Sequence, residues 1–259
     1  MISAGQKRRW LADIGNSRMK WGRLDETGRF VSARTMELDK VAISTALQLE
    51  GIGPETEWAI ASVNPPVAAL FASILLEIGV DQVRLYESAE KVPIKTAIGE
   101  PAKAGADRAL AVLAAQALSN QVGPSLVISC GTAITIERVN AAGIWEGGAI
   151  APGLSLAAKS LHHATALLPW VPTLKEVPAW GDSTIPAVAA GVFWGTVGAV
   201  SELIRRQGIS NWRYWTGGDA ALISSVIEEP GGQFQVVPDL VLRGLAMTAY
   251  GALVEEIRP

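Results

Sequence analysis

The stretch Leu11-Ala12-Asp13-Ile14-Gly15-Asn16-Ser17 recurs in pattern as Val127-Ile128-Ser129-Cys130-Gly131-Thr132-Ala133. Each copy is an apolar strand that ends in a glycine turn with a small polar residue, and a second strand follows it. A further glycine and another strand then follow each copy, at Gly28 and Gly143. Because the two copies are separated by close to half of the chain, the repeat predicts two related lobes whose glycine turns meet in one cleft.

Strand and helix signals alternate along the chain, which is typical of an α/β protein. Apolar runs predict strands at residues 9–14, 19–24, 29–37, 56–63, 83–86, 125–129, 133–139, 145–150, 212–215 and 233–237. Helical spacing predicts helices at residues 38–50, 65–78, 107–118, 154–166, 184–207, 219–227 and 240–257. No linker interrupts this order, so we expect an N-terminal lobe over residues 1–121 and a C-terminal lobe over residues 122–259, packed together.

The composition indicates a soluble, cytoplasmic protein. Its 259 residues are 49% hydrophobic, and the net charge of −3 argues against a nucleic-acid surface, which needs a concentrated basic face. Cys130 is the only cysteine, and His162 and His163 are the only histidines, so disulfide frameworks and cysteine-based zinc clusters are excluded. The uncharged run at residues 183–201 approaches the length of a membrane span, but proline and glycines dilute it and favour a buried helix.

Glycine turns between strands are suited to anion binding. Without a Cβ, backbone N–H groups can converge on a phosphate, and hydroxyl or amide side chains add donors. Either turn alone could be an ordinary hairpin, but their matched positions favour a clamp for a polyphosphate. In it Asp13 would bind a hydrated Mg²⁺ through the phosphate, and Lys20 would neutralise phosphate charge. Neither a P-loop nor a dinucleotide-binding fingerprint is present.

Two further segments each allow a structural and a chemical interpretation. Gly105-Ala106-Asp107-Arg108 begins a helix, where Asp107 either caps the helix or acts as a general base beside an arginine that can bind a carboxylate. Trp215-Thr216-Gly217-Gly218-Asp219 is either a loop with a helix cap or a place where adenine or ribose approaches the backbone. The nine tryptophans are scattered along the chain, and we expect them to pack in the core.

In their order and spacing these segments resemble those of type III pantothenate kinases, including Bvg accessory factors. The resemblance covers almost the whole chain, and its other segments are Gly131-Thr132-Ala133-Ile134-Thr135, Gly147-Gly148-Ala149-Ile150-Ala151-Pro152-Gly153, Thr165-Ala166-Leu167-Leu168-Pro169 and Pro238-Asp239-Leu240. It implies the duplicated, ribonuclease H-like fold of acetate and sugar kinases, actin and heat-shock ATPases, with the active site between the lobes. It also implies ATP-dependent phosphorylation of pantothenate to 4′-phosphopantothenate, the first step of coenzyme A synthesis.

The resemblance further implies roles for individual residues. ATP and Mg²⁺ would be bound by residues of the glycine turns, which are Asp13, Gly15, Asn16, Ser17, Lys20, Gly131, Thr132, Gly217 and Gly218. Pantothenate would be bound by Gly105, Ala106, Asp107, Arg108 and Thr184. Asp107 would be the base, and Arg108 would bind the distant carboxylate or position the loop. Members of the family are homodimers, so a homodimer is expected here.

Two positions depart from the pattern of the family. Ser129 stands where the family usually has an aspartate that helps to bind a monovalent cation such as K⁺ or NH₄⁺. Ile98 stands near the position of a substrate-contacting tyrosine. Since Asp13 and Asp107 are retained, we expect an active kinase. The alternatives are a catalytically weakened relative that binds nucleotide or pantothenate as a regulatory protein, and a kinase for another small hydroxylated acid.

Overall fold

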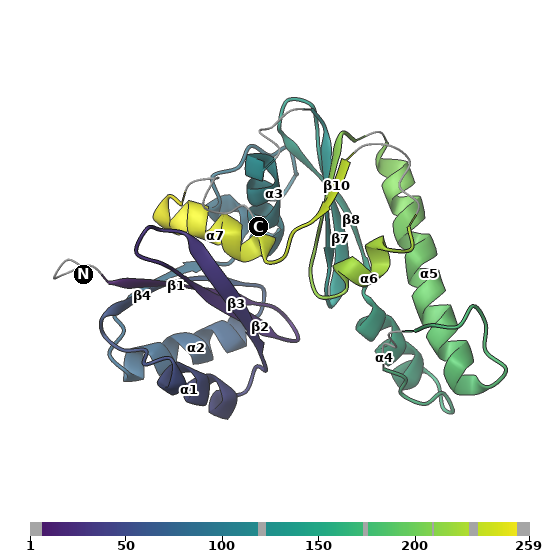
Figure 1. Ribbon diagram of the computed structural model, residues 1–259, viewed down its shortest axis with the longest axis horizontal. Coiled ribbons are helices and arrows are strands. Elements are labelled where there is room, and N and C mark those ends of the chain that lie inside the picture. Colours follow the sequence, from purple (N-terminus) through teal and green to yellow (C-terminus); the bar gives the residue numbers. More distant parts are fainter. Residues whose placement is uncertain (1–6, 119–122, 173–175, 209, 228–232, 253–259) are drawn as a thin grey trace. The chain divides into compact units, whose positions relative to one another are not determined.

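The computed structural model describes residues 7–118, 123–172, 176–208, 210–227 and 233–252 (Figure 1). The chain divides into two compact units. Unit 1 comprises Met1–Gln121 and Asp239–Pro259, and unit 2 comprises Val122–Pro238. The expected boundary between residues 121 and 122 lies outside the described residues. The expected C-terminal lobe differs from unit 2 in one respect, because the last helix packs with unit 1.

Unit 1 is built on a mixed sheet with the strand order β3-β2-β1-β4-β5. Its strands are β1 (Arg8–Ile14), β2 (Met19–Leu24), β3 (Phe30–Met36), β4 (Thr56–Ser62) and β5 (Gln82–Tyr86). Its helices are α1 (Lys40–Leu49), α2 (Pro65–Glu77), the 3₁₀ helix η1 (Ala89–Lys91), α3 (Ala106–Leu118) and α7 (Leu240–Tyr250). The side chains of Asp39 and Asn64 cap α1 and α2, and Pro65 occupies the first turn of α2, where no N–H is needed.

Tryptophans from three neighbouring strands form the centre of the unit 1 core. Trp10, Trp21 and Trp58 lie with their ring centroids 5.4 to 5.7 Å apart, and Phe71 of α2 meets Trp58 edge-on. Such offset and edge contacts suit the charge distribution of aromatic rings. The expected core role is confirmed for these tryptophans. It is wrong for three in unit 2 that are exposed, which are Trp170, Trp180 and Trp194.

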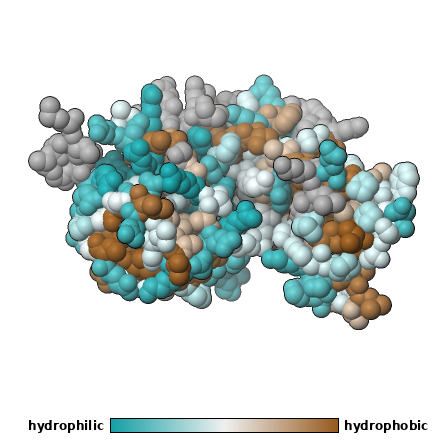
Figure 2. Space-filling view, turned by 60° about the horizontal axis from the view of Figure 1, so that its bottom comes forward, coloured by the Kyte–Doolittle hydropathy of each residue, from teal (hydrophilic) through white to brown (hydrophobic). Residues whose placement is uncertain are grey.

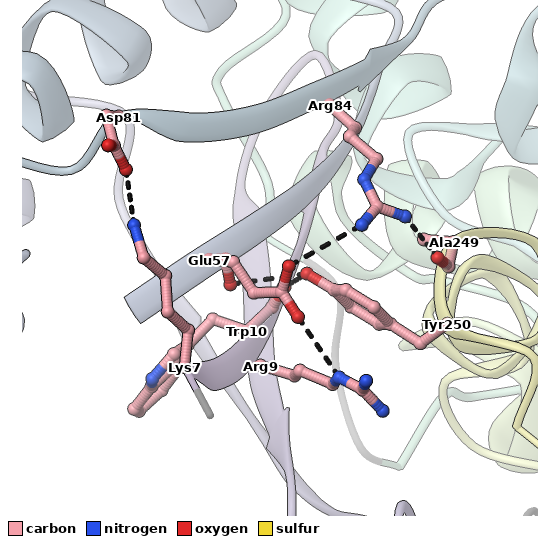
Figure 3. Close-up of polar contacts among 8 residues, drawn as sticks. All are labelled: Lys7, Arg9, Trp10, Glu57, Asp81, Arg84, Ala249 and Tyr250. Atoms are coloured by element: carbon pink, nitrogen blue, oxygen red, sulfur yellow. Dashed lines mark hydrogen bonds and ion pairs between the residues drawn. The ribbon is translucent and has the colours of Figure 1, made fainter. Parts of the chain in front are cut away.

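Helix α7 is fastened to unit 1 at its middle and at its end. Gly244 lies so close to the carbonyl oxygen of Leu110 in α3 that a Cβ would overlap it. The Tyr250 hydroxyl is 3.2 Å from a carbonyl oxygen of β1 and from one of β4, and the guanidinium groups of Arg9 and Arg84 lie 5.3 and 5.2 Å from its ring centroid (Figure 3). Burial raises the pKa of the Tyr250 phenol, so the hydroxyl remains a donor at neutral pH.

Unit 2 repeats the sheet of unit 1, with the strand order β10-β9-β6-β7-β8. Its strands are β6 (Ser125–Cys130), β7 (Ala133–Val139), β8 (Trp145–Pro152), β9 (Trp212–Thr216) and β10 (Gln233–Val236), and its helices are α4 (Leu154–Ala164), α5 (Thr184–Gln207) and α6 (Ala220–Ser224). In each sheet the central strand pairs antiparallel with the next strand of the chain and parallel with a later one. The repeat predicted from the sequence is therefore a repeat of topology.

Several helices end earlier than predicted, α1 and α2 by one residue and α4 by two. Helix α6 ends at Ser224 instead of residue 227. Helix α7 ends at Tyr250, because Gly251 adopts a left-handed conformation with φ 67° that terminates helices. The rest of the prediction, at residues 253–257, lies outside the described residues.

Helix α5 is long and apolar enough, by length and composition, to cross a membrane. In unit 2 it packs one face into the core beneath the sheet, with Phe193, Val197 and Val200 buried there. The most apolar part of α5 is 44% buried, so the expectation of a buried helix at residues 183–201 is met on this face, while the opposite face is exposed.

Candidate functional site

The first glycine turn joins β1 to β2 and aligns two opposite charges. Asp13 on β1 and Lys20 on β2 are directly opposite each other in the antiparallel register, so their side chains share one face of the sheet. The Gly15 N–H closes the turn by donating to the carbonyl oxygen of Arg18 at 3.1 Å. A Cβ on Gly15 would lie 3.2 Å from the same oxygen. The exposed residues at the tip of the turn are Asn16 and Ser17.

Asp107 lies in the first turn of α3, where a glycine makes room for its carboxylate. Gly105 forms an isolated bridge with Ser88 just before the helix. A Cβ on Gly105 would overlap Oδ1 of Asp107 and would lie 2.9 Å from Cγ1 of Val63. The segment therefore requires glycine at this position if the Asp107 side chain is to keep its place. Of the neighbouring residues, Ala106 is buried and Arg108 is partly exposed.

Three charged side chains of unit 1 act on Asp13, and we call the four residues the charged cluster: Asp13, Lys20, Asp107 and Asp239. Burial and the carboxylate of Asp107, helped more weakly by Asp239, raise the pKa of Asp13 to about 7 against the opposing effect of the Lys20 ammonium. Nζ of Lys20 donates to Oδ1 of Asp239 at 2.9 Å, with the two side chains 29% and 19% exposed. Three carboxylates beside one ammonium favour the binding of a cation.

The charged cluster does not form a complete metal site by itself. In the described part of the chain, no group of three or more His, Cys, Asp or Glu side chains could hold a metal ion. Mg²⁺ commonly binds through one or two carboxylates and completes its shell with waters and substrate phosphates. The residues present fit a Mg²⁺ that arrives with a nucleotide.

The second glycine turn and the Gly217 turn lie against each other in unit 2. The Gly131 N–H closes its turn by donating to the carbonyl oxygen of Ala133 at 3.1 Å. Gly217, with φ 96°, lies so close to the backbone of Cys130 that a Cβ would overlap its carbonyl oxygen. The Asp219 N–H donates to that oxygen at 3.1 Å. The predicted phosphate turn and the predicted adenosine turn therefore form one backbone surface.

The residues beside Gly131 contribute neutral groups. Ser129 and Thr132 are partly exposed, and the N–H of Gly153 donates to the Thr132 carbonyl oxygen at 3.0 Å. Cys130 is buried, and burial together with the Asp219 carboxylate raises the pKa of its thiol to about 12. Since the thiolate is the nucleophilic form, this cysteine is chemically inert.

Two residues predicted to bind pantothenate lie on other segments. Thr184 is the exposed first residue of α5. Ile98 is partly exposed in the irregular segment before α3, and its N–H donates to Oγ1 of Thr96 at 3.2 Å. The charged cluster thus contains Asp13, Lys20 and Asp107 of the predicted residues, while Thr184 and Ile98 are not part of it.

Asp239 belongs to the charged cluster, although its sequence context does not predict a role in the site. Pro238-Asp239-Leu240 has the pattern of an ordinary helix N-terminus, where aspartate commonly caps the helix. Its partner Lys20 is 219 positions away, so no local pattern could have indicated the contact.

Comparisons with known proteins point to one family. A family profile described as type III pantothenate kinase matches residues 10–206. A type III pantothenate kinase of Synechococcus elongatus is 35% identical over 262 residues, covering 95% of this chain and 98% of the relative. One from Legionella pneumophila is 33% identical, covering 92% and 96%. One from Acidiphilium cryptum is 41% identical over 166 residues, covering 61% and 59%.

Solved structures with a similar fold have lower identity. A Sinorhizobium meliloti protein assigned as a 2-dehydro-3-deoxygalactonokinase is 14% identical with a TM-score of 0.58, covering 94% of this chain and 98% of that one. The activator of the 2-hydroxyisocaproyl-CoA dehydratase from Clostridium difficile, solved with bound ADPNP, is 13% identical with a TM-score of 0.53, covering 96% and 95%. These likenesses establish the fold shared by sugar kinases, actin and heat-shock ATPases.

Proposed function

Because the chain belongs to the type III pantothenate kinase family, we propose that its charged cluster is the chemical centre of that activity. The reaction is the ATP-dependent phosphorylation of pantothenate to 4′-phosphopantothenate, in coenzyme A biosynthesis. One observation carries the assignment of the site: Asp13 lies opposite Lys20 in the sheet of unit 1 and is acted on by the Asp107 carboxylate. Asp13 provides a carboxylate for a hydrated metal, Lys20 provides a cation for phosphate, and Asp107 provides a second carboxylate that can accept a proton.

Asp107 is the base in this proposal. Phosphoryl transfer depends mainly on alignment and charge neutralisation, with little covalent work for the protein. As the hydroxyl oxygen of pantothenate bonds to the γ-phosphorus of ATP and ADP leaves, the Asp107 carboxylate accepts the hydroxyl proton. Arg108, the next residue on α3, binds the pantothenate carboxylate or positions the loop. Ile98 and Thr184 complete the substrate contacts.

The glycine turns bind the nucleotide in this proposal. Asn16 and Ser17 offer donors to the phosphates, and Thr132 offers a second set. The N–H groups of Gly15 and Gly131 are bonded within their turns and hold the backbone in place. Gly217 and Gly218 leave the backbone open to adenosine. Mg²⁺ would neutralise phosphate charge, with Asp13 holding it through water. Ser129 offers a single neutral oxygen to K⁺ or NH₄⁺, so a bound monovalent cation would depend on other ligands.

A coupled ADP-release assay with MgATP and pantothenate, run with K⁺, with NH₄⁺ and with neither, tests the function. We expect release that depends on pantothenate, and a fall in kcat of about 10³-fold in Asp107→Asn, because a positioned base is lost. Asp81→Asn is the matched control, since Asp81 is an exposed aspartate of unit 1 that pairs with Lys7 (Figure 3). Absence of pantothenate-dependent turnover with any cation, together with retained nucleotide binding, would favour the regulatory alternative.

We also propose that the protein is a cytoplasmic homodimer that associates through α5. Gly191, Gly195 and Gly198 lie three or four positions apart on one exposed face of this helix, and the exposed Trp194 lies beside them. A Cβ on any of these glycines would meet nothing within 4 Å, so a second backbone can approach closely. Figure 2 shows hydrophobic surface over α4 and α5, and the large exposed side chains there include Leu156, Leu161, Trp170, Ile185 and Trp194.

Light scattering coupled to size-exclusion chromatography tests this association. We expect a dimer for the unchanged chain and a monomer for Gly195→Arg, which places a charge in the middle of the face. Leu76→Arg on α2 of unit 1 is the control, because Leu76 is 70% exposed and lies outside the proposed interface. A dimer that survives Gly195→Arg would place the interface elsewhere.

A further inference from the structure

Asp239 has an unusual backbone conformation for its place in the fold. Among the described residues it is the only non-glycine residue with a positive φ, at 61° with ψ 32°. Aspartate and asparagine tolerate this left-handed region better than most residues, but it still costs conformational energy. Strain of this kind persists where the surrounding structure holds it, and it is a reason to look for a function.

The side chain of Asp239 is used differently from those of the other polar caps in unit 1. Asp39 and Asn64 each accept a hydrogen bond from the first turn of the helix that they precede. Asp239 precedes α7 and makes no such bond. Its Oδ1 accepts instead from Nζ of Lys20 at 2.9 Å. The first turn of α7 therefore lacks a side-chain cap from Asp239, and the Asp239 carboxylate instead binds Lys20 beside the first glycine turn.

Helix α7 also contacts the element that carries Asp107. Gly244 packs against the backbone of Leu110 without room for a Cβ, and Asp107 lies one turn before Leu110 on α3. The far end of α7 is fixed by Tyr250 between Arg9 and Arg84 (Figure 3). A helix held at these points gives the Asp239 carboxylate a defined position relative to both Lys20 and α3.

We infer that Asp239 is a positioning residue for Lys20. Its carboxylate holds the Lys20 ammonium opposite Asp13, where the ammonium contacts the phosphate that is transferred. The inference rests on the proposed function, because it assigns Lys20 to the phosphate. An ammonium has three donors, so one can remain on Asp239 while the others contact phosphate oxygens. Asp239 acts through Lys20, and its carboxylate adds negative charge near the nucleotide. Its removal should therefore lower kcat without weakening nucleotide binding.

A double-mutant cycle of Asp239→Asn and Lys20→Ala tests the inference. Asparagine tolerates the left-handed conformation, so the variant removes the charge and keeps the backbone. We expect Asp239→Asn to lower kcat about tenfold, with a change in the Kd of MgATP below about threefold. In the Lys20→Ala background the same substitution should cost less than about twofold. A merely structural role would lower kcat by the same factor in both backgrounds, and that result, or no loss in either, would overturn the inference.

Two further measurements complete the test. Asp39→Asn is the matched control, because it removes an aspartate that only caps a helix, and kcat should stay within about twofold of the unchanged chain. Reductive methylation of Lys20, read by mass spectrometry without nucleotide, should become severalfold faster in Asp239→Asn, because the lysine has lost the negative charge of its partner. An unchanged rate would overturn the inference whether or not pantothenate is phosphorylated. Failure of the unchanged chain to phosphorylate pantothenate would count against the proposed function alone.

Discussion

The two glycine turns share a backbone design and differ in the groups around them. In each, the glycine N–H donates at 3.1 Å to a nearby carbonyl oxygen and closes the turn, at Gly15 in unit 1 and at Gly131 in unit 2. The first turn lies beside the charged cluster of unit 1. The second is flanked by neutral Ser129 and Thr132, and Gly217 packs directly against it.

This difference indicates that the turn of unit 1 is adapted to act on charged groups. The turn of unit 2 is adapted to let a ligand approach the backbone closely. A charged cluster acts on groups whose charge changes during a reaction, because preorganised charges favour the transition state. A surface of backbone atoms recognises shape, and any added atom disturbs it. Substitutions in unit 1 should therefore change the chemistry most, and substitutions in unit 2 should change the fit of the nucleotide.

Among substitutions in the two turns, Asp13→Asn should give the largest effect, and it should move activity and stability in opposite directions. Loss of the carboxylate should lower kcat by about 10²-fold or more, since charge stabilisation is lost. The pKa of Asp13 is about 7 in the folded chain, against 3.8 for an aspartate in an unfolded one, so the ionised form disfavours folding. Stability is then lost as the pH rises from about 4 to 7. Asparagine avoids this loss and should add up to about 4 kcal/mol at pH 8.

Urea unfolding of the ligand-free proteins at pH 4.5 and pH 8 measures this effect. The gain from Asp13→Asn should be much smaller at pH 4.5, where the folded state keeps the carboxyl protonated. Ser129→Asn, at the corresponding position of unit 2, is the comparison variant and should show no such dependence on pH. An equal gain at both pH values for Asp13→Asn would mean that ionisation of Asp13 is not its cause.

Gly217→Ala and Gly218→Ala form a matched pair that tests how closely the Gly217 turn must pack against the second glycine turn of unit 2. The first places a Cβ against the Cys130 backbone at φ 96°, and we expect a loss of about 3 kcal/mol of stability and weaker MgATP binding. The second places a Cβ where nothing lies within 4 Å, and we expect a loss below about 1 kcal/mol. Thermal unfolding and calorimetric titration would measure both. Similar losses for the pair would mean that contact with Cys130 does not shape this surface.

Ser129→Asp would make the second turn more like the first. The new carboxylate should favour a monovalent cation, so stimulation of turnover by K⁺ should increase severalfold. Ser129→Asn adds an oxygen of similar reach without the charge, and it should leave the response to K⁺ nearly unchanged. A K⁺ response that is the same in all three proteins would show that position 129 does not face the cation.

The smallest effect is expected at Cys130, which lies beside the second turn but does not share its chemistry. Because burial raises the pKa of its thiol to about 12, iodoacetamide at pH 8 should modify almost none of the native protein. In denaturant the thiol should react fully. Mass spectrometry of the two samples gives the result, and fast modification of the native chain would show that the second turn opens readily.

Much of this architecture is predictable because its signals are local. The turn at Gly15 connects two short apolar strands, and a two-stranded hairpin then brings Asp13 opposite Lys20. Pro65 begins α2 because its ring suits a first helical turn. The repeat at Gly131 extends the same interpretation to unit 2, so both turns can be recognised from the sequence.

Other features depend on contacts between distant residues. Nothing near Leu240–Tyr250 indicates that this helix belongs to unit 1, since its partners Leu110 and Trp10 come far earlier in the chain. The stacking of Trp10 on Trp58 likewise depends on the pairing of β1 with β4. The role inferred for Asp239 requires the position of Lys20 as well as its own backbone conformation.

The return of α7 to unit 1 has a consequence for the order in which the protein is assembled. Tyr250 contacts the backbone of Trp10, 240 positions earlier, so the ribosome must synthesise all of unit 2 before it supplies this helix. Contacts between such distant residues form slowly, and an incomplete core exposes apolar surface to aggregation. Unit 2 is encoded in one continuous stretch and can close its core as soon as it emerges. The half that is translated first is therefore the half that finishes folding last.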